Sequence, residues 1–263
     1  MTNDTPAHFS PGVLSKFYVN TVIFFLIVPI LVGIVVAFTS GDRMEFPIPG
    51  VSLRWFYDAL SKPQFIEGLL NSLIIALCSA VLATIAGTGA AIALNQYDFV
   101  GRTLIRAAVM MPIVIPGILV GLSLLFTLSS YGMEPGLLAS TIGHAVVGIP
   151  YVVAMVLAAL ANYDRSLELA SLNLGVGPVG TFMKITLPLI KGGVMAGGIT
   201  AFLISFDNIS VSLFTARGDT LPLRLLQQLR GYIDPSVAAI STLLIIGSLV
   251  LLALLLPFVM KSR

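Results

Sequence analysis

The side chains that could do chemistry are few, and the most unusual of them is Asp207. It lies in a long apolar stretch that contains no other Asp, Glu, Lys or Arg. A carboxylate in hydrocarbon costs about 2.5–3.5 kcal/mol on insertion scales, so it normally faces a polar path or a partner group. Ser205 and Asn208 are polar neighbours. We interpret the three as lining a path for a cationic solute. The alternative is a hydrogen bond between packed helices, with Asn71 or Ser72 as partner.

No pattern typical of a catalytic site accompanies these residues. The chain has two histidines and one cysteine, and it lacks His-Glu-x-x-His, Gly-x-Ser-x-Gly and any metal-type Cys/His spacing. It also lacks the Gly-x-x-x-x-Gly-Lys-Ser/Thr loop that cradles nucleotide phosphates. We interpret His144 as a hydrogen-bonded packing residue and not as a ligand. We therefore expect no enzyme, no metal or cofactor in this chain and no nucleic-acid partner.

The composition indicates that the chain lies in lipid. Of 263 residues, 57% are apolar and 10% are charged, with a mean hydropathy of +1.01, whereas soluble domains are about 25% charged. Six stretches exceed the ~20 residues that a helix needs to cross ~30 Å of hydrocarbon, and helices satisfy their own backbone there. We predict an all-α integral membrane protein with a single transmembrane domain over 1–263. The six predicted helices span approximately 18–39, 69–94, 105–127, 137–161, 193–214 and 237–259.

Six spans place both termini on the same side of the membrane. With the termini inside, eight Lys and Arg residues lie inside and six lie outside. Loops on the inner side carry the excess of Lys and Arg, so we predict that both termini are inside. The outer segment 215–236 predicts a short helix that begins near Pro222. It could lie at the membrane interface or dock an outside partner.

Prolines interrupt the predicted helices at two places. Pro112 and Pro116 lack the N–H of an ordinary helical residue, so they should kink the third span and leave carbonyls unpaired. A moving gate helix and a static kink are both compatible with this pattern. Pro188 should bend or break the chain just before the fifth span.

The loop 162–191 has more structure than a simple connection needs. Asp164 can accept hydrogen bonds from a starting helix, and Gly175 can end that helix in the left-handed conformation. Gly177 and Pro178 mark a turn, after which a second amphipathic segment follows. By spacing alone, the first helix could also rest on the membrane surface.

This loop resembles the cytoplasmic "EAA" loop of binding-protein-dependent ABC-importer permeases, which reads E-A-A-x-x-x-G, then a proline, an aromatic and I-x-L-P. The motif glutamate is replaced by Leu169, and Glu168 stands one residue earlier. The segments "GLLNSLIIAL" (68–77) and "MMPIVIPGILVG" (110–121) are similar to the second and third spans of that family. "SFDNISVSLFTARGDTLPLRLLQQLR" is similar to the spermidine/putrescine permease subgroup. The matching loop residues are Ala170, Ser171, Gly175, Pro178, Phe182, Ile185, Leu187 and Pro188.

The resemblance implies a permease subunit of an ATP-driven importer in a bacterial inner membrane, with loop 162–191 as the coupling loop. ATP and Mg would be bound by two ABC ATPase subunits. The other implied partners are membrane lipid, a periplasmic substrate-binding protein and a second permease, either a related chain or a copy. The implied substrate is a polyamine or similar organic cation. The residues assigned to ATPase coupling are Glu168, Leu169, Ala170, Ser171, Gly175, Pro178 and Phe182.

Two other functions remain open at this point. A secondary transporter or channel would work without an ATPase, and it would predict more intramembrane ionisable groups and paired interrupted helices in two halves. A non-transporting scaffold would leave Asp207 and the proline-rich span without a purpose.

Overall fold

The computed structural model describes residues 12–161, 163–231 and 234–260, and nearly all of them are helical. Within these ranges the only β-type pairing is an isolated bridge between Thr39 and Val51. The all-α prediction is therefore confirmed for the described residues. They form two compact units. The smaller unit contains the residues up to 61 together with 228–249, and the larger unit contains residues 62–227 together with those from 250 onward.

The smaller unit contains α1 (Val13–Ala37) and α2 (Arg54–Ser61). Most described side chains of α1 are exposed, although this helix is strongly apolar. Such a helix is stable where its surroundings are hydrocarbon. The Trp55 indole N–H of α2 donates to the backbone carbonyl of Gly41 at 3.0 Å, which holds the connection against α2.

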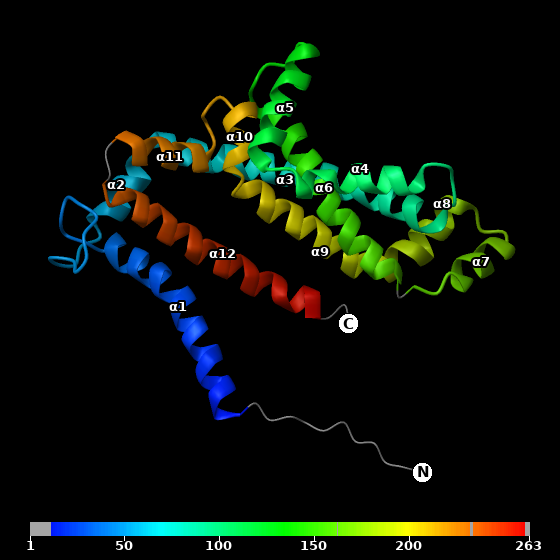
Figure 1. Ribbon diagram of the computed structural model, residues 1–263, viewed down its shortest axis with the longest axis horizontal. Helices are drawn as coiled ribbons and strands as arrows, with labels where there is room; N and C mark the ends of the chain where they lie inside the picture. The colour runs from blue at the N-terminus through cyan, green and yellow to red at the C-terminus, as the bar shows by residue number, and fades with distance from the viewer. Residues whose placement is uncertain (1–11, 162, 232–233, 261–263) are drawn as a thin grey trace. The chain divides into compact units, whose positions relative to one another are not determined.

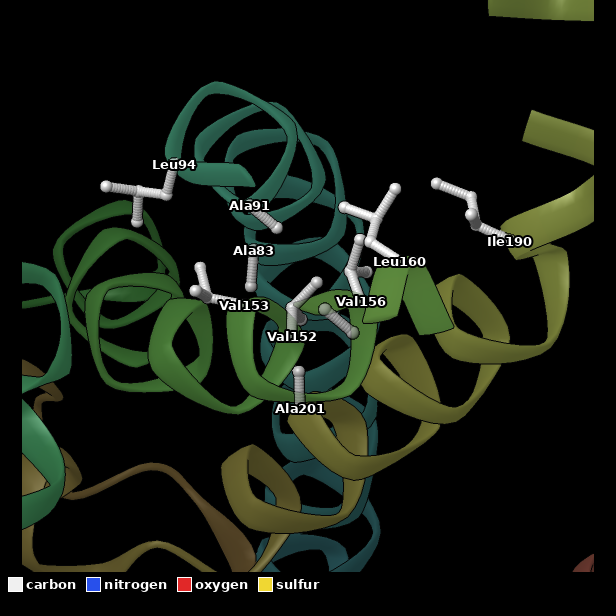
Figure 2. Close-up of a cluster of buried hydrophobic side chains, with 10 residues drawn as sticks. Ala83, Ala91, Leu94, Val152, Val153, Val156, Leu160, Ile190 and Ala201 are labelled. Atoms are coloured by element: carbon white, nitrogen blue, oxygen red, sulfur yellow. The ribbon is translucent and has the colours of Figure 1, made fainter. Parts of the chain in front are cut away.

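The larger unit is built on α3 (Pro63–Gln96), α6 (Leu137–Ala161) and α9 (Leu187–Phe206) (Figure 1). Their contact is made by small and β-branched side chains. Figure 2 shows Val152 of α6 between Ala83 of α3 and Ala201 of α9. In lipid, helices associate through close van der Waals packing, because the solvent is as apolar as the side chains.

Glycines bring these three helices close together. A Cβ added to Gly197 would lie 2.9 Å from the Cα of Val152, and one added to Gly87 would lie 2.7 Å from the Cβ of the same valine. Neither position tolerates a side chain without a shift of the neighbouring helix. Gly87 thus makes a close contact between helices, whereas Gly89 faces open space.

In the described part of the chain, four helices are long and apolar enough to cross a membrane: Ser15–Ala37, Pro63–Gln96, Leu137–Ala161 and Pro178–Phe206. A bent pair of helices could supply a fifth span. α12 (Ser236–Met260) covers the sixth predicted segment. Within α12, residues Ser236–Val250 form a shorter apolar helical stretch. Six spans with both termini inside stay a prediction.

The third predicted span is not one helix. α4 (Arg102–Val114) and α5 (Gly117–Ser130) meet at an angle of 112°. At 1.5 Å per residue each is about 20 Å long, so neither alone crosses ~30 Å of hydrocarbon. Pro116 lies at the break and cannot donate a backbone hydrogen bond. The predicted kink in the third span is therefore present, at Pro116, and the span over 105–127 stays a prediction.

Pro112 lies inside α4 and does not break it. It lines an apolar hollow of about 250 Å³ in the elbow between α4 and α5, together with Met111, Ile115 and Leu124. The kink predicted for the pair of prolines is thus made by the second of them.

The fifth predicted span begins earlier and is interrupted. A helical segment runs from α8 (Pro178–Thr181) through a π-helical turn, η1 (Phe182–Thr186), into α9. The π turn carries the chain past Pro188, whose missing N–H would have broken a regular α-helix. Of the predicted bend or break at Pro188, the break is therefore absent, since the helical segment continues through this residue. A break occurs instead at residues 207–208, before α10 (Ile209–Thr215).

Candidate functional site

The first part of the candidate site is α7 (Ser166–Asn173), a helix with defined ends. The Asp164 carboxylate accepts from the backbone N–H of Ser166 at 2.9 Å, and this hydrogen bond lowers the pKa of Asp164. At the other end Gly175 has a φ of +82°. The N–H of Val176 donates to Ser171 O at 3.2 Å, and the N–H of Gly175 donates to Leu172 O. These two bonds form a Schellman motif, which ends a helix sharply.

Several apolar side chains on α7 and just after it are exposed. Leu169 is 52% exposed and Leu174 is 84% exposed. Leu167, Leu172 and Val179 extend the same kind of surface along α7 and α8. Isolated exposed apolar residues are ordinary, but several on one short helix indicate a contact surface.

The inner face of α7 is polar and is held by the neighbouring helices. Ser171 is buried, with its hydroxyl oxygen 3.0 Å from that of Thr181 in α8. The half-buried Glu168 carboxylate accepts hydrogen bonds from the Gln96 amide at 3.0 and 2.9 Å and from the Thr186 hydroxyl. Figure 1 shows α7 and α8 at the end of the unit where α6 stops and the segment leading into α9 starts.

The structure divides the seven coupling residues assigned from sequence into two groups. The first group points toward the other helices of the unit, and the second is exposed. Sequence reasoning missed Gln96 and Thr186, because neither belongs to the loop motif. The inward residues are Glu168, Ser171 and Phe182, and the exposed ones are Leu169, Ala170, Gly175 and Pro178.

The second part of the site is the break between α9 and α10. Asp207 follows the last residue of α9 and is exposed. It lines an open hollow of about 570 Å³ with Leu203, Ile204, Asn208, Ile209 and Ser210. The Asn208 side chain accepts from the Val211 N–H at 2.9 Å and so caps α10. An N-cap asparagine is the sequence signal that could have located this break.

Asn71 and Ser72 hold a different segment from the one expected. The Asn71 amide donates to the carbonyl of Asp219 at 3.1 Å, and the Ser72 hydroxyl accepts from the N–H of Leu221 at 2.9 Å. They therefore anchor the start of α11 (Leu221–Gly231) on α3. The interpretation that one of them is the partner of Asp207 is not supported.

Ser205 faces the helix packing and not the hollow at Asp207. It is 5% exposed, and its hydroxyl accepts from Ser79 at 2.9 Å. The Nδ1 of His144 lies 2.8 Å from the same hydroxyl, and its Nε2 lies 3.0 Å from the Ser212 hydroxyl. His144 on α6 thus contacts α9 and α10 on both sides of the break. It is a hydrogen-bonded packing residue.

The loop, both breaks and most of the three-helix core fall within a single recognised sequence family. Residues 81–261, more than half of the chain, match the family described as "Binding-protein-dependent transport system inner membrane component". The chain belongs to this family. It is thus an ABC-importer permease subunit of a bacterial inner membrane, and ATP hydrolysis belongs to a separate subunit.

Two relatives of this permease resemble it over most of its length. The spermidine/putrescine transport system permease protein PotC of Haemophilus influenzae is 29% identical, over 92% of this chain and 96% of the relative. The putrescine transport system permease protein PotI of Escherichia coli K12 is 30% identical, over 84% of this chain and 82% of the relative. The permease is therefore related to polyamine transport permeases.

A solved structure shares the fold. A chain of a bacterial ABC transporter involved in the import of the acidic polysaccharide alginate superposes with a TM-score of 0.68, at 14% identity and over 95% of each chain. ABC-importer permeases of this kind work with ATPase and binding-protein partners. The exposed face of α7 and the break at Asp207 can therefore be considered as features of a transport subunit.

Proposed function

We propose that this permease imports a polyamine or a similar small organic cation, with six spans and both termini in the cytoplasm. It would assemble with two ATPase subunits, a second and related permease, and a periplasmic binding protein that delivers the solute. ATP and Mg would be bound by the ATPase subunits. In this arrangement α7 is the coupling helix, and the break at Asp207 lies on the path of the solute.

The exposed apolar side chains of α7 are the observation that carries the coupling role. Leu167, Leu169 and Leu172 are exposed on a helix that is held to its neighbours through Glu168 and Ser171. Covering these side chains with a groove of the ATPase would remove apolar surface from water, at about 25 cal/mol per Å². The sharp end at Gly175 and the continuous helix into α9 give the docked helix a stiff connection to a span.

The carboxylate of Asp207 supports a cationic substrate. It lies at the interruption of a span, where α9 has ended and α10 has not begun, so the local backbone is also polar. Irregular backbone at membrane depth is tolerated where it lines a cavity or is buried in protein. A carboxylate there would attract an ammonium group and would repel an anion. The names of the relatives PotC and PotI point to the same class of solute.

Two steps test this proposal. The tagged permease is purified gently from its native membrane, and the proteins that accompany it are identified by mass spectrometry. The assembled transporter is then placed in liposomes with its binding protein, and uptake of labelled putrescine and spermidine is measured with and without ATP. ATP-dependent uptake of either polyamine is expected. Uptake without ATP, or a complex that transports an anion and neither polyamine, would contradict it.

A secondary transporter is not favoured by any observation on the described residues. The family match supports an ATP-driven importer in its place. The liposome experiment separates the two directly, because only the importer requires nucleotide.

A further inference from the structure

Glu168 connects α7 to two helices that are distant from it in the sequence. Its carboxylate oxygens accept from Nε2 of Gln96, which is the last residue of α3, at 3.0 and 2.9 Å. The same carboxylate accepts from the hydroxyl of Thr186, the last residue of the π turn that continues into α9. One side chain of α7 therefore contacts the ends of two of the three core helices.

The geometry of this contact makes it stronger than an ordinary surface hydrogen bond. Hydrogen bonds to an ionised carboxylate are roughly twice as strong as those between neutral groups. Gln96, Glu168 and Thr186 are all at least half-buried, and Thr186 is fully buried. Burial raises the pKa of the Tyr163 phenol, and the negative charge of Glu168 raises it further.

Glu168 also faces away from the surface that a partner would cover. Leu169 and Ala170, which follow it, are exposed, whereas both of its oxygens are engaged inside the chain. A side chain in this position is not free to contact the ATPase. Its role must then lie in what it does to α7 itself.

We propose that Glu168 is a positioning residue that fixes α7 to the ends of α3 and of the helix leading into α9. A displacement of α7 by the ATPase is then delivered to both spans at once, through the Gln96 amide and the Thr186 hydroxyl. This inference rests on the proposed function, because it requires α7 to be the coupling helix.

An exchange of side chains tests the contact. Gln96→Glu places two carboxylates together, and Glu168→Gln places two amides together. The double variant Gln96→Glu with Glu168→Gln restores one amide and one carboxylate with their places exchanged. Asp98→Asn is the matched control, because it also removes a carboxylate close to the end of α3. The Asp98 side chain is 95% exposed, and it pairs with Arg102 and not with α7.

Each variant is assembled with its ATPase, second permease and binding protein in liposomes. The readouts are putrescine taken up per ATP hydrolysed and the amount of ATPase that co-purifies with the permease. Each single variant is expected to lower the uptake per ATP by about threefold or more, as changes within a coupling network do. The double variant is expected to return to within about twofold of the wild type, because coupled neighbours are non-additive. ATPase recovery and the Asp98→Asn control should match the wild type.

Three results would overturn the inference while leaving the importer intact. The first is wild-type uptake per ATP in both single variants. The second is a double variant that is no better than the singles. The third is loss of ATPase from Glu168→Gln alone, which would make Glu168 a docking residue. A wild-type transporter that needs no ATP would instead refute the proposed function, and this inference with it.

Discussion

The left-handed turn at Gly175 should be required for coupling, and this can be tested without creating any clash. Gly175 has a φ of +82°, and a Cβ added there would meet nothing within 4 Å. Gly177 also has open space around it, but its φ is −63°. Serine substituted at each position therefore adds the same atoms to the same solvent, and only at Gly175 does it strain the backbone.

The expected cost follows from that single difference. A non-glycine residue in the left-handed region costs about 1–2 kcal/mol, which is a factor of about 5–30 in the population of the turn. Losing the turn releases the hydrogen bonds from the N–H groups of Gly175 and Val176 that end α7. The docked helix would then move without moving the segment that leads into α9. Gly175→Asn should lie between glycine and serine, because asparagine tolerates this conformation better than other residues.

The measurement is putrescine uptake per ATP hydrolysed by the assembled transporter in liposomes. Gly175→Ser is expected to keep ATP hydrolysis and to lose about fivefold or more of the uptake per ATP. Gly177→Ser is expected to match the wild type. Equal uptake per ATP in the two serine variants would show that the shape of this turn does not matter, and would refute the coupling role assigned to it.

Three further outcomes are expected. Asp207→Asn should lower the efficiency of putrescine uptake by about 5–150-fold, because an ammonium group about 5 Å away gains about 1–3 kcal/mol from the carboxylate; Asp207→Glu should retain most uptake, and equal uptake in both variants would argue against a role for the charge. Gly197→Ala should lower the melting temperature of the purified transporter, since its Cβ would lie 2.9 Å from the Cα of Val152 and overpacking costs about 1–3 kcal/mol. Gly89→Ala, which meets nothing within 4 Å, is its control, and an equal shift in both would count against the packing argument. His144→Phe should also lower the melting temperature, because it leaves the buried Ser212 hydroxyl without its His144 partner, at about 1–3 kcal/mol, and removes one of the partners of the Ser205 hydroxyl; an unchanged melting temperature would mean that these contacts add nothing.

Local chemistry explains which features could be predicted from the sequence. The left-handed Gly175 and the cap at Asp164 each depend on one residue and its immediate neighbours, and both are present in the structure. Pro116 lacks a backbone N–H, and the chain is interrupted at this residue as the sequence predicts. Long apolar stretches predict helices because lipid leaves the backbone no other partners.

The interruption at residues 207–208 shows where this reasoning stops. No proline or glycine marks it, so the apolar stretch 193–214 indicated one continuous helix. The structure ends α9 at Phe206 and begins a new helix under the Asn208 cap. The opposite holds at Pro188, where the sequence predicts a bend or a break and the helical segment continues through a π turn. A helix break depends on what the surrounding helices can accommodate, as well as on the residue itself.

The side chains that join distant segments could be found in the tertiary structure alone. Glu168 meets a glutamine 72 positions away, and His144 meets serines 61 and 68 positions away. Which helix faces which is settled by the fit of small residues such as Gly87 and Gly197 against Val152, and periodicity carries no information about that fit. Composition, prolines and glycines thus establish a helical membrane protein with a structured loop. Packing between helices establishes which face of that loop is held inside and which is left for a partner.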